Sequence, residues 1–495
     1  MMNRRQVMNL LIDDFISTTT GKISLKTLLT SPQDHQLQYY FDETQLAMLQ
    51  LLSSLTTVLL KPTLNELRNY LANGVTAQIY EQALAKIELE WFDEHSFMRS
   101  KAPKNTVLAD GPITKLVSGI ECGGSPNALG LFSEVEQADV VCPDCTHVLN
   151  YNLHMNIKGE CFGPTGATGI RGGGAISTLI AGKYLKTTVL ANCVVSDYFN
   201  AIRATDDANE SFMWQEIPQG QTYFSHEIGL SRGLFALAYH IDFPVLNEPC
   251  LCDVCGHKAE QSVKQFSRAK YTGSYGSTKN GRDTGAGWWP HPYTPITVRE
   301  EGVFPICARD QNWHSWQQFT AYVIGNETNK SAVEPAYIIK QFQKLDPNSV
   351  VNLLVGGNIA DQGSITGRVY DLYSMPADWH KNFQRVKQII DLGLQVKEQL
   401  SQALNKIFGV GFDKNFVGGI KDHAMNRFIS NAQQIVQQLL IEVERKEATQ
   451  MRKEAIDALH QEAKTIYASV MRKYQHDLPL FKALIKGEAS LIKRI

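Results

Sequence analysis

The sequence predicts an α+β protein in which a large, irregular N-terminal domain of helices and strands precedes a C-terminal four-helix bundle. Three observations support this prediction. The chain has 495 residues, which is too long for one hydrophobic core. Residues 91–350 are rich in Gly, Pro, Trp and Tyr, and their short apolar runs are separated by turn signals. After residue 378 the apolar positions recur at helical spacing instead. We therefore predict domains at 1–378 and 379–495.

The first ninety residues are expected to form short strands followed by three helices. Residues 7–30 have the pattern of strand pieces joined by polar turns. Leucines fall at helical spacing within 42–60. A second helix is predicted over 63–73, because Thr-Leu-Asn-Glu at its start forms a capping box and a glycine follows its end. A third is predicted over 76–90.

The C-terminal region has the pattern of three to four long helices with short breaks. Residues 379–409 are amphipathic, residues 421–475 are almost free of Gly and Pro, and the tail from Leu478 is apolar at helical spacing. From residue 380 onward there are 19 Lys and Arg against 12 Asp and Glu, a net charge of +7, and the rest of the chain carries −9. A basic helical surface of this kind is compatible with nucleic-acid binding and equally with an ordinary solvated face.

The composition indicates a folded protein of the cytoplasm that does not bind membranes. No stretch approaches ~20 apolar residues without a charge. The opening MMNRRQVMNLLIDDF does not have the pattern of a signal peptide, because Asp13 and Asp14 interrupt its short apolar run. In that compartment the nine cysteines are not expected to form disulfides.

Two CxxC pairs predict a structural zinc site. Four thiolates at this local spacing suit a tetrahedral zinc ion, which would join two loops 106 residues apart along the chain. The candidate ligands are Cys142, Cys145, Cys252 and Cys255. Two alternatives remain: Cys250 or His257 could replace one ligand, or the cysteines could pack as small buried hydrophobic residues.

The segment CFGPTGATGIRGGGA, residues 161–175, contains six glycines. Glycine is used where backbone must take positive φ or approach another group closely. TGATGIRG, residues 165–172, also has the spacing of an NAD(P)-binding loop, so an NAD(P)-dependent oxidoreductase is the alternative function. The required preceding strand and surrounding strand–helix repeats are missing from the sequence pattern.

No motif for catalysis was found. The chain lacks the nucleophile elbow, the HExxH metalloprotease motif, the phosphate-binding lysine loop and the kinase signatures. His291 lies between two prolines and is expected to be structural. The sequence therefore predicts a protein that is not an enzyme.

Several segments together resemble one family from near the start of the chain to its end. They are MNLLID, IRGGGAISTLI, IGLSRGLF, the second CxxC followed by Gly, GWWPHP, GGNIADQGSI and the helical C-terminus. In order and spacing they are similar to the large subunit, CasA, of the type I-E CRISPR surveillance complex Cascade. The resemblance implies a non-catalytic role in antiviral defence. Such a subunit recognises the PAM in double-stranded DNA, starts R-loop formation, and offers a docking site to the helicase-nuclease, alongside crRNA and the other Cascade subunits.

The resemblance also implies which residues contact DNA at the PAM. The family's glycine loop corresponds to Cys161–Gly166, with Gly163 and Gly166 as the residues of closest approach to the minor groove. The glutamine wedge that separates the first base pair corresponds to Gln362, with Asp361 and Gly363 on either side. We expect Gly169 and the glycines at 172–174 to serve backbone packing instead.

Two further contacts follow from the same resemblance. The lysine finger in the minor groove corresponds to Lys279, with Arg282 as the alternative. The loop over 123–141 occupies the place at which the family contacts the crRNA 5′ handle. That loop has no basic residue, so we expect apolar contacts there from Leu129 or Phe132.

Overall fold

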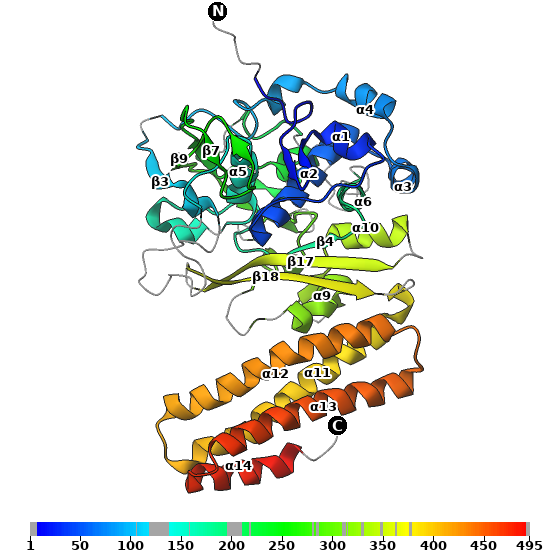
Figure 1. Ribbon diagram of the computed structural model, residues 1–495, viewed down its shortest axis with the longest axis vertical. Coiled ribbons are helices and arrows are strands. Elements are labelled where there is room, and N and C mark those ends of the chain that lie inside the picture. Colours follow the sequence, from blue (N-terminus) through cyan, green and yellow to red (C-terminus); the bar gives the residue numbers. More distant parts are fainter. Residues whose placement is uncertain are drawn as a thin grey trace, which may run out of the picture. The chain divides into compact units, whose positions relative to one another are not determined.

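Two structural units divide the chain in the computed structural model (Figure 1). The first unit comprises Met1–Gln311, Gly325–Asp346 and Leu353–Leu372, and the second comprises Asn312–Ile324, Pro347–Asn352 and Tyr373–Ile495. The structure describes residues 7–491 except 105, 118–137, 158, 196–209, 217–218, 280–281, 284–286, 309–312, 314, 328–330, 347–349, 362–363 and 376–378.

The first unit mixes short helices with small sheets. Its α-helices are α1 (Leu25–Thr30), α2 (Asp42–Leu60), α3 (Leu64–Asn73), α4 (Ala77–Leu84), α5 (Cys145–Met155), α6 (Leu185–Ala191), α8 (Leu230–Leu234) and α10 (Tyr337–Leu345), and 3-10 turns include η1 (Leu89–Phe92) and η3 (Gly159–Thr165). Its strands up to the middle of the chain are β1 (Ile16–Thr18), β2 (Gly21–Ile23), β3 (Ala109–Pro112), β4 (Ser177–Ile180), β5 (Thr222–Phe224), β6 (Tyr239–Asp242), β7 (Cys250–Leu251), β8 (Lys258–Ala259) and β9 (Gln265–Lys270).

The later strands complete the sheets. They are β10 (Ser274–Gly276), β11 (Thr278–Lys279), β12 (Arg282–Asp283), β13 (Ile296–Arg299), β14 (Gly302–Pro305), β15 (Asn326–Glu327), β16 (Ser331–Glu334), β17 (Val351–Asp361) and β18 (Ser364–Met375). In the part of the chain that the structure describes, three sheets have more than two strands, in the orders β3-β9-β6, β18-β17-β4 and β14-β13-β16-β15. In the first, the central strand β9 pairs antiparallel with both neighbours.

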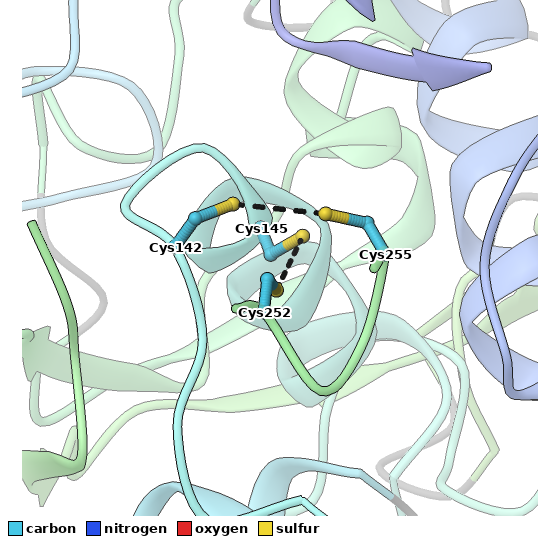
Figure 2. A group of neighbouring side chains, drawn as sticks. All are labelled: Cys142, Cys145, Cys252 and Cys255. Atoms are coloured by element: carbon cyan, nitrogen blue, oxygen red, sulfur yellow. Dashed lines mark hydrogen bonds between the residues drawn. The ribbon is translucent and has the colours of Figure 1, made fainter. Parts of the chain in front are cut away.

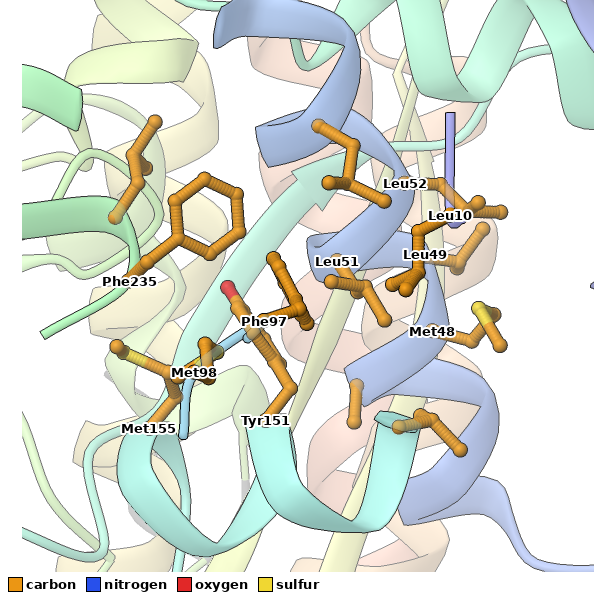
Figure 3. Packing of buried hydrophobic residues seen from close by; sticks show 14 of the residues in the cluster. Leu10, Met48, Leu49, Leu51, Leu52, Phe97, Met98, Tyr151, Met155 and Phe235 are labelled. Carbon is orange, nitrogen blue, oxygen red and sulfur yellow. The ribbon is translucent and has the colours of Figure 1, made fainter. Parts of the chain in front are cut away.

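Helix α2 is the centre of the first unit's core. The leucines that predicted this helix are buried, and so are most of its polar residues, including Gln50 and Ser53. It therefore runs through the unit and does not lie on its surface. Figure 3 shows Leu51 of α2 next to Phe97 and to Tyr151 of α5, and Met155 of α5 lies farther from the leucines, beside Met98.

Local signals predicted the second helix correctly. The Thr63 hydroxyl accepts a hydrogen bond from the Glu66 amide, and the Glu66 carboxylate accepts one from the Thr63 amide at 2.8 Å. Gly74 ends the helix at a φ of 81°. The capping box and the glycine stop predicted over 63–73 are therefore confirmed.

Two local predictions were wrong. Residues 25–30 form the short helix α1 and not a strand, because the Ser24 hydroxyl caps the Thr27 amide and three leucine side chains enter the core. The helix predicted over 76–90 ends at Leu84. Beyond that end the chain turns, and Phe92 packs edge-on against Phe212 in the core.

The second unit contains the bundle. Its four long helices are α11 (Phe383–Leu404), α12 (Lys414–Glu442), α13 (Ala448–Lys473) and α14 (Leu478–Leu491), with the 3-10 turn η7 (Asn405–Val410) after α11. The shorter η5 (Ser315–Gln318), α9 (Phe319–Val323) and η6 (Trp379–Asn382) accompany them. The predicted fold class, an irregular α+β region followed by a four-helix bundle, is confirmed.

Trp316 fixes an earlier segment of the chain against the bundle within the second unit. It is fully buried, and its indole N–H donates to the Ile429 carbonyl of α12 at 2.9 Å. A side chain at Gly393 of α11 would meet the Trp316 ring at 2.8 Å. The absence of a side chain at that position therefore makes room for the indole.

No single helix in the described part of the chain is long and apolar enough to cross a membrane. Helices α2 and α3 reach the necessary length and composition only as a pair, and they are bent by 120°.

Candidate functional site

The two CxxC pairs meet in one buried cluster. Figure 2 shows the four sulfur atoms pointing toward a common centre from the start of α5 and from the turn after β7. All four residues are buried, and their ligand atoms lie within 4.8 Å of one another. Sulfur–sulfur distances are 3.9 Å for Cys142–Cys255 and 3.7 Å for Cys145–Cys252.

These distances fit a tetrahedral zinc ion. Zn–S bonds of about 2.3 Å place neighbouring thiolates of a tetrahedron about 3.8 Å apart. Each short contact joins one cysteine of the first pair to one of the second, so a metal held here would cross-link the two loops. The four cysteines can therefore hold zinc in the way that the sequence predicted.

Backbone hydrogen bonds bring the two loops together. Val141 and Val263 exchange two hydrogen bonds, at 2.8 and 3.0 Å. The Asp253 carboxylate accepts from the amides of Asp139 and Val140, both at 2.9 Å, and the Asp253 amide donates to the Val140 carbonyl. The segment before the first pair is thus bound to the turn of the second pair by contacts that involve no cysteine.

The electrostatics of the cluster also favour a cation. Hydrogen bonds from Cys142, Cys145 and Cys252 lower the pKa of the Cys255 thiol. Conversely, hydrogen bonding with the other three cysteines, followed by burial, raises the pKa of Cys145. The hydrogen bonds thus favour the thiolate at Cys255 and the thiol at Cys145, and a metal that binds all four sulfurs requires all four as thiolates.

Lys22 lies beside the cluster and was not predicted. Its ammonium group lies 3.7 Å from the Cys142 sulfur and forms an ion pair with Asp144. Burial opposes the charge, but Cys142 and Asp144 outweigh burial and raise the pKa of Lys22. No sequence spacing could reveal this contact, because 120 residues separate Lys22 from Cys142.

The alternative zinc ligands lie outside the cluster. The Cys250 thiol donates to the Gln261 carbonyl at 3.4 Å. Among the described residues, neither Cys250 nor His257 joins the group of four. The substitution of either for one of the four cysteines is therefore not supported by the geometry.

The glycine-rich segment divides into two parts with different roles. Residues 159–167, which we call the glycine-rich loop, contain η3 and the predicted contact residues Gly163 and Gly166. The Thr165 side chain is exposed and Gly166 is half-buried. The structure therefore presents this part at the surface of its unit.

The second part packs inside the unit. A side chain at Gly169 would lie 2.3 Å from the His154 carbonyl, and one at Gly172 would meet the Trp288 ring at 2.7 Å. Gly172, Gly173 and Gly174 also have φ between 66° and 79°. The packing role predicted for these glycines is confirmed for Gly169 and Gly172, and positive φ gives a reason for glycine at all three of 172–174.

A buried arginine fixes the segment between these parts. Arg171 is 1% exposed and donates to the hydroxyls of Ser177 and Thr294 at 2.7 and 2.8 Å, and to the Asn156 side chain. Burial lowers its pKa to about 10. The same segment leads directly into strand β4, and helix α6 begins only after that strand, so the predicted alternative of an NAD(P)-binding loop lacks the adjoining helix N-terminus that would bind the pyrophosphate.

The predicted wedge lies at the end of a strand pair. Strands β17 and β18 are hydrogen-bonded neighbours in one sheet, and Asp361 is the last residue of β17. Gln362 and Gly363, which connect the strands, lie outside the described residues. The strands on either side of the predicted wedge are therefore paired with each other, and the roles of Asp361, Gln362 and Gly363 remain predictions.

The other predicted contacts are placed only in part. Lys279 and Arg282 are paired opposite each other in the β11–β12 hairpin, and their side chains are not described. Leu129 and Phe132 lie outside the described residues. His291 is fully buried, and burial holds its pKa well below the ordinary value, as expected for a structural residue.

Comparison with known proteins identifies the family. Residues 9–468 match the family described as CRISPR-associated protein Cse1. This chain belongs to the Cse1 family. The family assignment made from the sequence, to the large subunits of type I-E Cascade, is thereby confirmed.

Solved Cse1 structures have the same fold. Thermus thermophilus CasA (Cse1) superposes with a TM-score of 0.70 at 12% identity, covering 98% of both chains. Thermobifida fusca Cse1 gives 0.69 at 14% identity, covering 99% of this chain and 98% of that one. A chain from a structure titled CRISPR RNA-guided surveillance complex gives 0.65 at 14% identity, covering 98% of this chain and all of that one. Structural similarity at such low sequence identity shows that this chain has the same fold as these proteins.

Proposed function

We propose that this Cse1-family chain is the non-catalytic large subunit of an RNA-guided DNA surveillance complex. In this role it binds crRNA and the other Cascade subunits in the cytoplasm, recognises the PAM in double-stranded DNA, and starts duplex opening. It also offers a docking site to the helicase-nuclease that degrades the target. Membership of the Cse1 family over residues 9–468 is the observation that carries the proposal.

The glycine-rich loop is proposed to read the minor groove at the PAM. That groove is only about 6 Å wide, so a loop that approaches its floor must do so with backbone. Gly163 and Gly166 provide backbone without side chains, and the neighbouring Thr165 side chain is exposed. Lys279 would place a cation in the same groove, whose potential is negative.

Gln362 is proposed to separate the first base pair beside the PAM. Unstacking a base step costs a few kcal/mol. In the sequence Gln362 directly follows β17 and β18 begins at Ser364, so a paired strand lies on each side of the proposed wedge. Pairing with the guide RNA would then supply sequence specificity, so the protein itself needs to read only the short PAM.

Zinc is proposed to have a structural role. Cys142, Cys145, Cys252 and Cys255 would hold the ion, which would supply a cross-link between α5 and the β7–β8 hairpin. A division of the chain at residue 378, between a DNA-reading N-terminal domain and the helical bundle, is likewise proposed.

The experiment measures PAM recognition by the assembled complex. Duplexes with and without a PAM are titrated into wild-type and Gly166→Asp complexes at one salt concentration. Aspartate adds bulk and negative charge where backbone must enter the groove, so affinity for the PAM duplex should fall at least tenfold, or about 1.4 kcal/mol. Asn73→Asp, which adds the same charge on an exposed residue of α3, is the control.

Wild-type PAM affinity in the Gly166→Asp complex would mean that the glycine-rich loop does not read the PAM. If Gly166→Asp and Asn73→Asp weakened binding equally, the effect would be one of general charge repulsion.

A further inference from the structure

The glycine-rich loop closes on itself. A side chain at Gly159 would lie 2.0 Å from the Ala167 carbonyl oxygen, so the two ends of the loop are in direct contact. Within the loop, the Thr165 hydroxyl donates to the Phe162 carbonyl at 3.0 Å. Contacts between its own ends do not fix how the loop is oriented on the unit, so its orientation depends on contacts with residues outside the loop.

Tyr239 of β6 provides one such contact. Its hydroxyl accepts a hydrogen bond from the Ala167 amide at 2.6 Å and donates to the Ala167 carbonyl at 3.1 Å. Its ring also meets Phe162 edge-on, with centroids 6.1 Å apart. One side chain thus holds both main-chain polar groups at the loop's C-terminal end.

Arg268 of β9 provides the other contact. Its guanidinium group lies 4.1 Å from the centroid of the Phe162 ring and donates to the Thr165 hydroxyl at 2.8 Å. The Thr165 hydroxyl therefore accepts from Arg268 while donating to Phe162, which fixes its orientation. Arg268 is 5% exposed and forms no ion pair with the described residues.

Both contacts come from one sheet. β9 is its central strand, and the register pairs Arg268 with Ile241 of β6 and Ala109 of β3. Strands held on both sides are a more rigid support than a loop. Phe266, on the same strand, flanks the guanidinium with its ring centroid at 5.8 Å.

We propose that Arg268 and Tyr239 are positioning residues that hold the glycine-rich loop in the conformation that reads DNA. The inference rests on the proposed function of this loop in PAM recognition. A pre-ordered loop pays less conformational entropy on binding, so its affinity for the correct groove is higher. Arg268 also places a positive charge behind the loop that faces the DNA.

Three conservative variants test the proposal in the assembled complex. Arg268→Lys keeps the charge but loses the planar group that contacts both Phe162 and Thr165. Tyr239→Phe removes only a hydroxyl, and Thr165→Val replaces a hydroxyl with a methyl group of similar size. Arg299→Lys is the matched control, because Arg299 of β13 also covers a phenylalanine ring, that of Phe304 at 5.4 Å, away from the glycine-rich loop.

The readouts separate positioning from general stability. Arg268→Lys should lower affinity for a PAM duplex about tenfold, as expected when a hydrogen bond from a charged group is removed. Affinity for a duplex without a PAM, and the melting temperature of the subunit, should stay at wild-type values. Hydrogen exchange of the amides at 159–167 should become faster. Tyr239→Phe and Thr165→Val should change PAM affinity and exchange in the same direction, and Arg299→Lys should change neither.

The outcomes distinguish this inference from the proposed function. If Gly166→Asp loses PAM binding while all three variants keep wild-type PAM discrimination and exchange rates, the inference is wrong and the proposed function stands. If Gly166→Asp has no effect, the loop's proposed function is itself wrong. Equal loss of affinity for both duplexes with a lower melting temperature would show that Arg268 and Tyr239 only stabilise the fold.

Discussion

Single side chains decide the chemistry of the cysteine cluster. The four thiols fit a zinc ion in distance, and Lys22 adds a positive charge 3.7 Å from one of them. A zinc ion with four thiolates carries a net charge of −2, which is costly to bury unless cations or hydrogen-bond donors lie nearby. Lys22 meets part of that need, so the cluster and its neighbour belong to one site.

Zinc content is the first prediction at this scale. Purified protein should contain about one zinc ion per chain, because one tetrahedral site of four cysteines is present among the described residues. Cys142→Ser or Cys255→Ser should abolish it, since serine is a poor zinc ligand. Cys250→Ser, beside the cluster but not in it, should keep the metal. Metal analysis of the three variants is the measurement, and wild-type protein without zinc would contradict the assignment.

The wedge and the glycine-rich loop should fail differently. Gln362→Ala leaves the groove-reading loop intact but removes the group proposed to hold the first base step apart, so PAM binding should persist while R-loop formation slows. A target already unpaired beside the PAM supplies that opened step. It should therefore rescue Gln362→Ala substantially and Gly166→Asp much less, as measured by strand-opening fluorescence. Equal rescue of both variants would mean that the two roles are wrongly assigned.

A buried histidine should make the first unit sensitive to acid. Nδ1 of His154 accepts from the Ala238 amide at 3.0 Å, which requires the neutral ring, and burial lowers its pKa to about 3. The unfolded chain binds a proton near pH 6.5 and the folded one does not. Stability from this group is therefore complete above about pH 6.5 and declines by about 1.4 kcal/mol per pH unit down to about pH 3.

His154→Asn, which keeps an acceptor without a titrating ring, isolates this contribution. Urea unfolding of both proteins from about pH 7.5 to about pH 4.5 should give a difference in unfolding free energy that changes with that slope. A constant difference across the range would show that His154 does not titrate on unfolding.

At the scale of elements, the proposed DNA contacts fall next to paired strands. The sheet β3-β9-β6 supports the glycine-rich loop through two side chains, and the predicted wedge residue Gln362 lies between β17 and β18 in the sequence. The C-terminal region differs in its charge, because residues 380–495, which include the bundle, carry a net charge of +7. Helical surfaces with such an excess bind phosphates without reading sequence.

The bundle gives an element-scale prediction. If α11–α14 follow the DNA backbone, replacing exposed lysines with glutamine should weaken binding equally for all PAM variants. Lys387 and Lys414 are exposed, form no ion pair within the described residues, and are the first to replace. The slope of log affinity against log salt should shrink by about 0.9 for each phosphate that the protein no longer neutralises. An unchanged slope would show that the charge serves solubility alone.

At the scale of the whole molecule, the chain forms two units, and the candidate zinc site belongs to only one of them. All four cysteines lie in the first unit, and the four long helices lie in the second. The second unit is completed by residues 312–324, whose Trp316 fills the space beside Gly393. The cysteine cluster thus belongs to the first unit, and the packing of Trp316 against Gly393 belongs to the second.

Removing zinc should therefore destabilise one unit only. Treatment of the full-length protein with a strong chelator should speed hydrogen exchange in α5 and around β7 and β8, because the cross-link between them is removed. Exchange in α11–α14 should not change. Faster exchange in both units would show that their stabilities are coupled.

The sequence by itself determined most local features of this protein. Periodicity placed α2 and the bundle, and the capping box and glycine stop placed α3, because these signals depend on residues a few positions apart. The two CxxC pairs predicted the cysteine cluster because metal ligands have restrictive local spacing. The order of motifs along the chain gave the Cse1 family, which the match over residues 9–468 confirms.

Only the tertiary structure decided which residues far apart in the sequence contact one another. No glycine, proline or capping motif near Leu84 predicts that the third helix ends there, and spacing could not predict that Phe92 packs against Phe212. Spacing likewise could not reveal that Lys22 contacts Cys142, or that Arg268 contacts the glycine-rich loop from 103 residues away. Such contacts depend on how strands pair and helices pack, and a pattern that repeats every two to four residues holds no information about them.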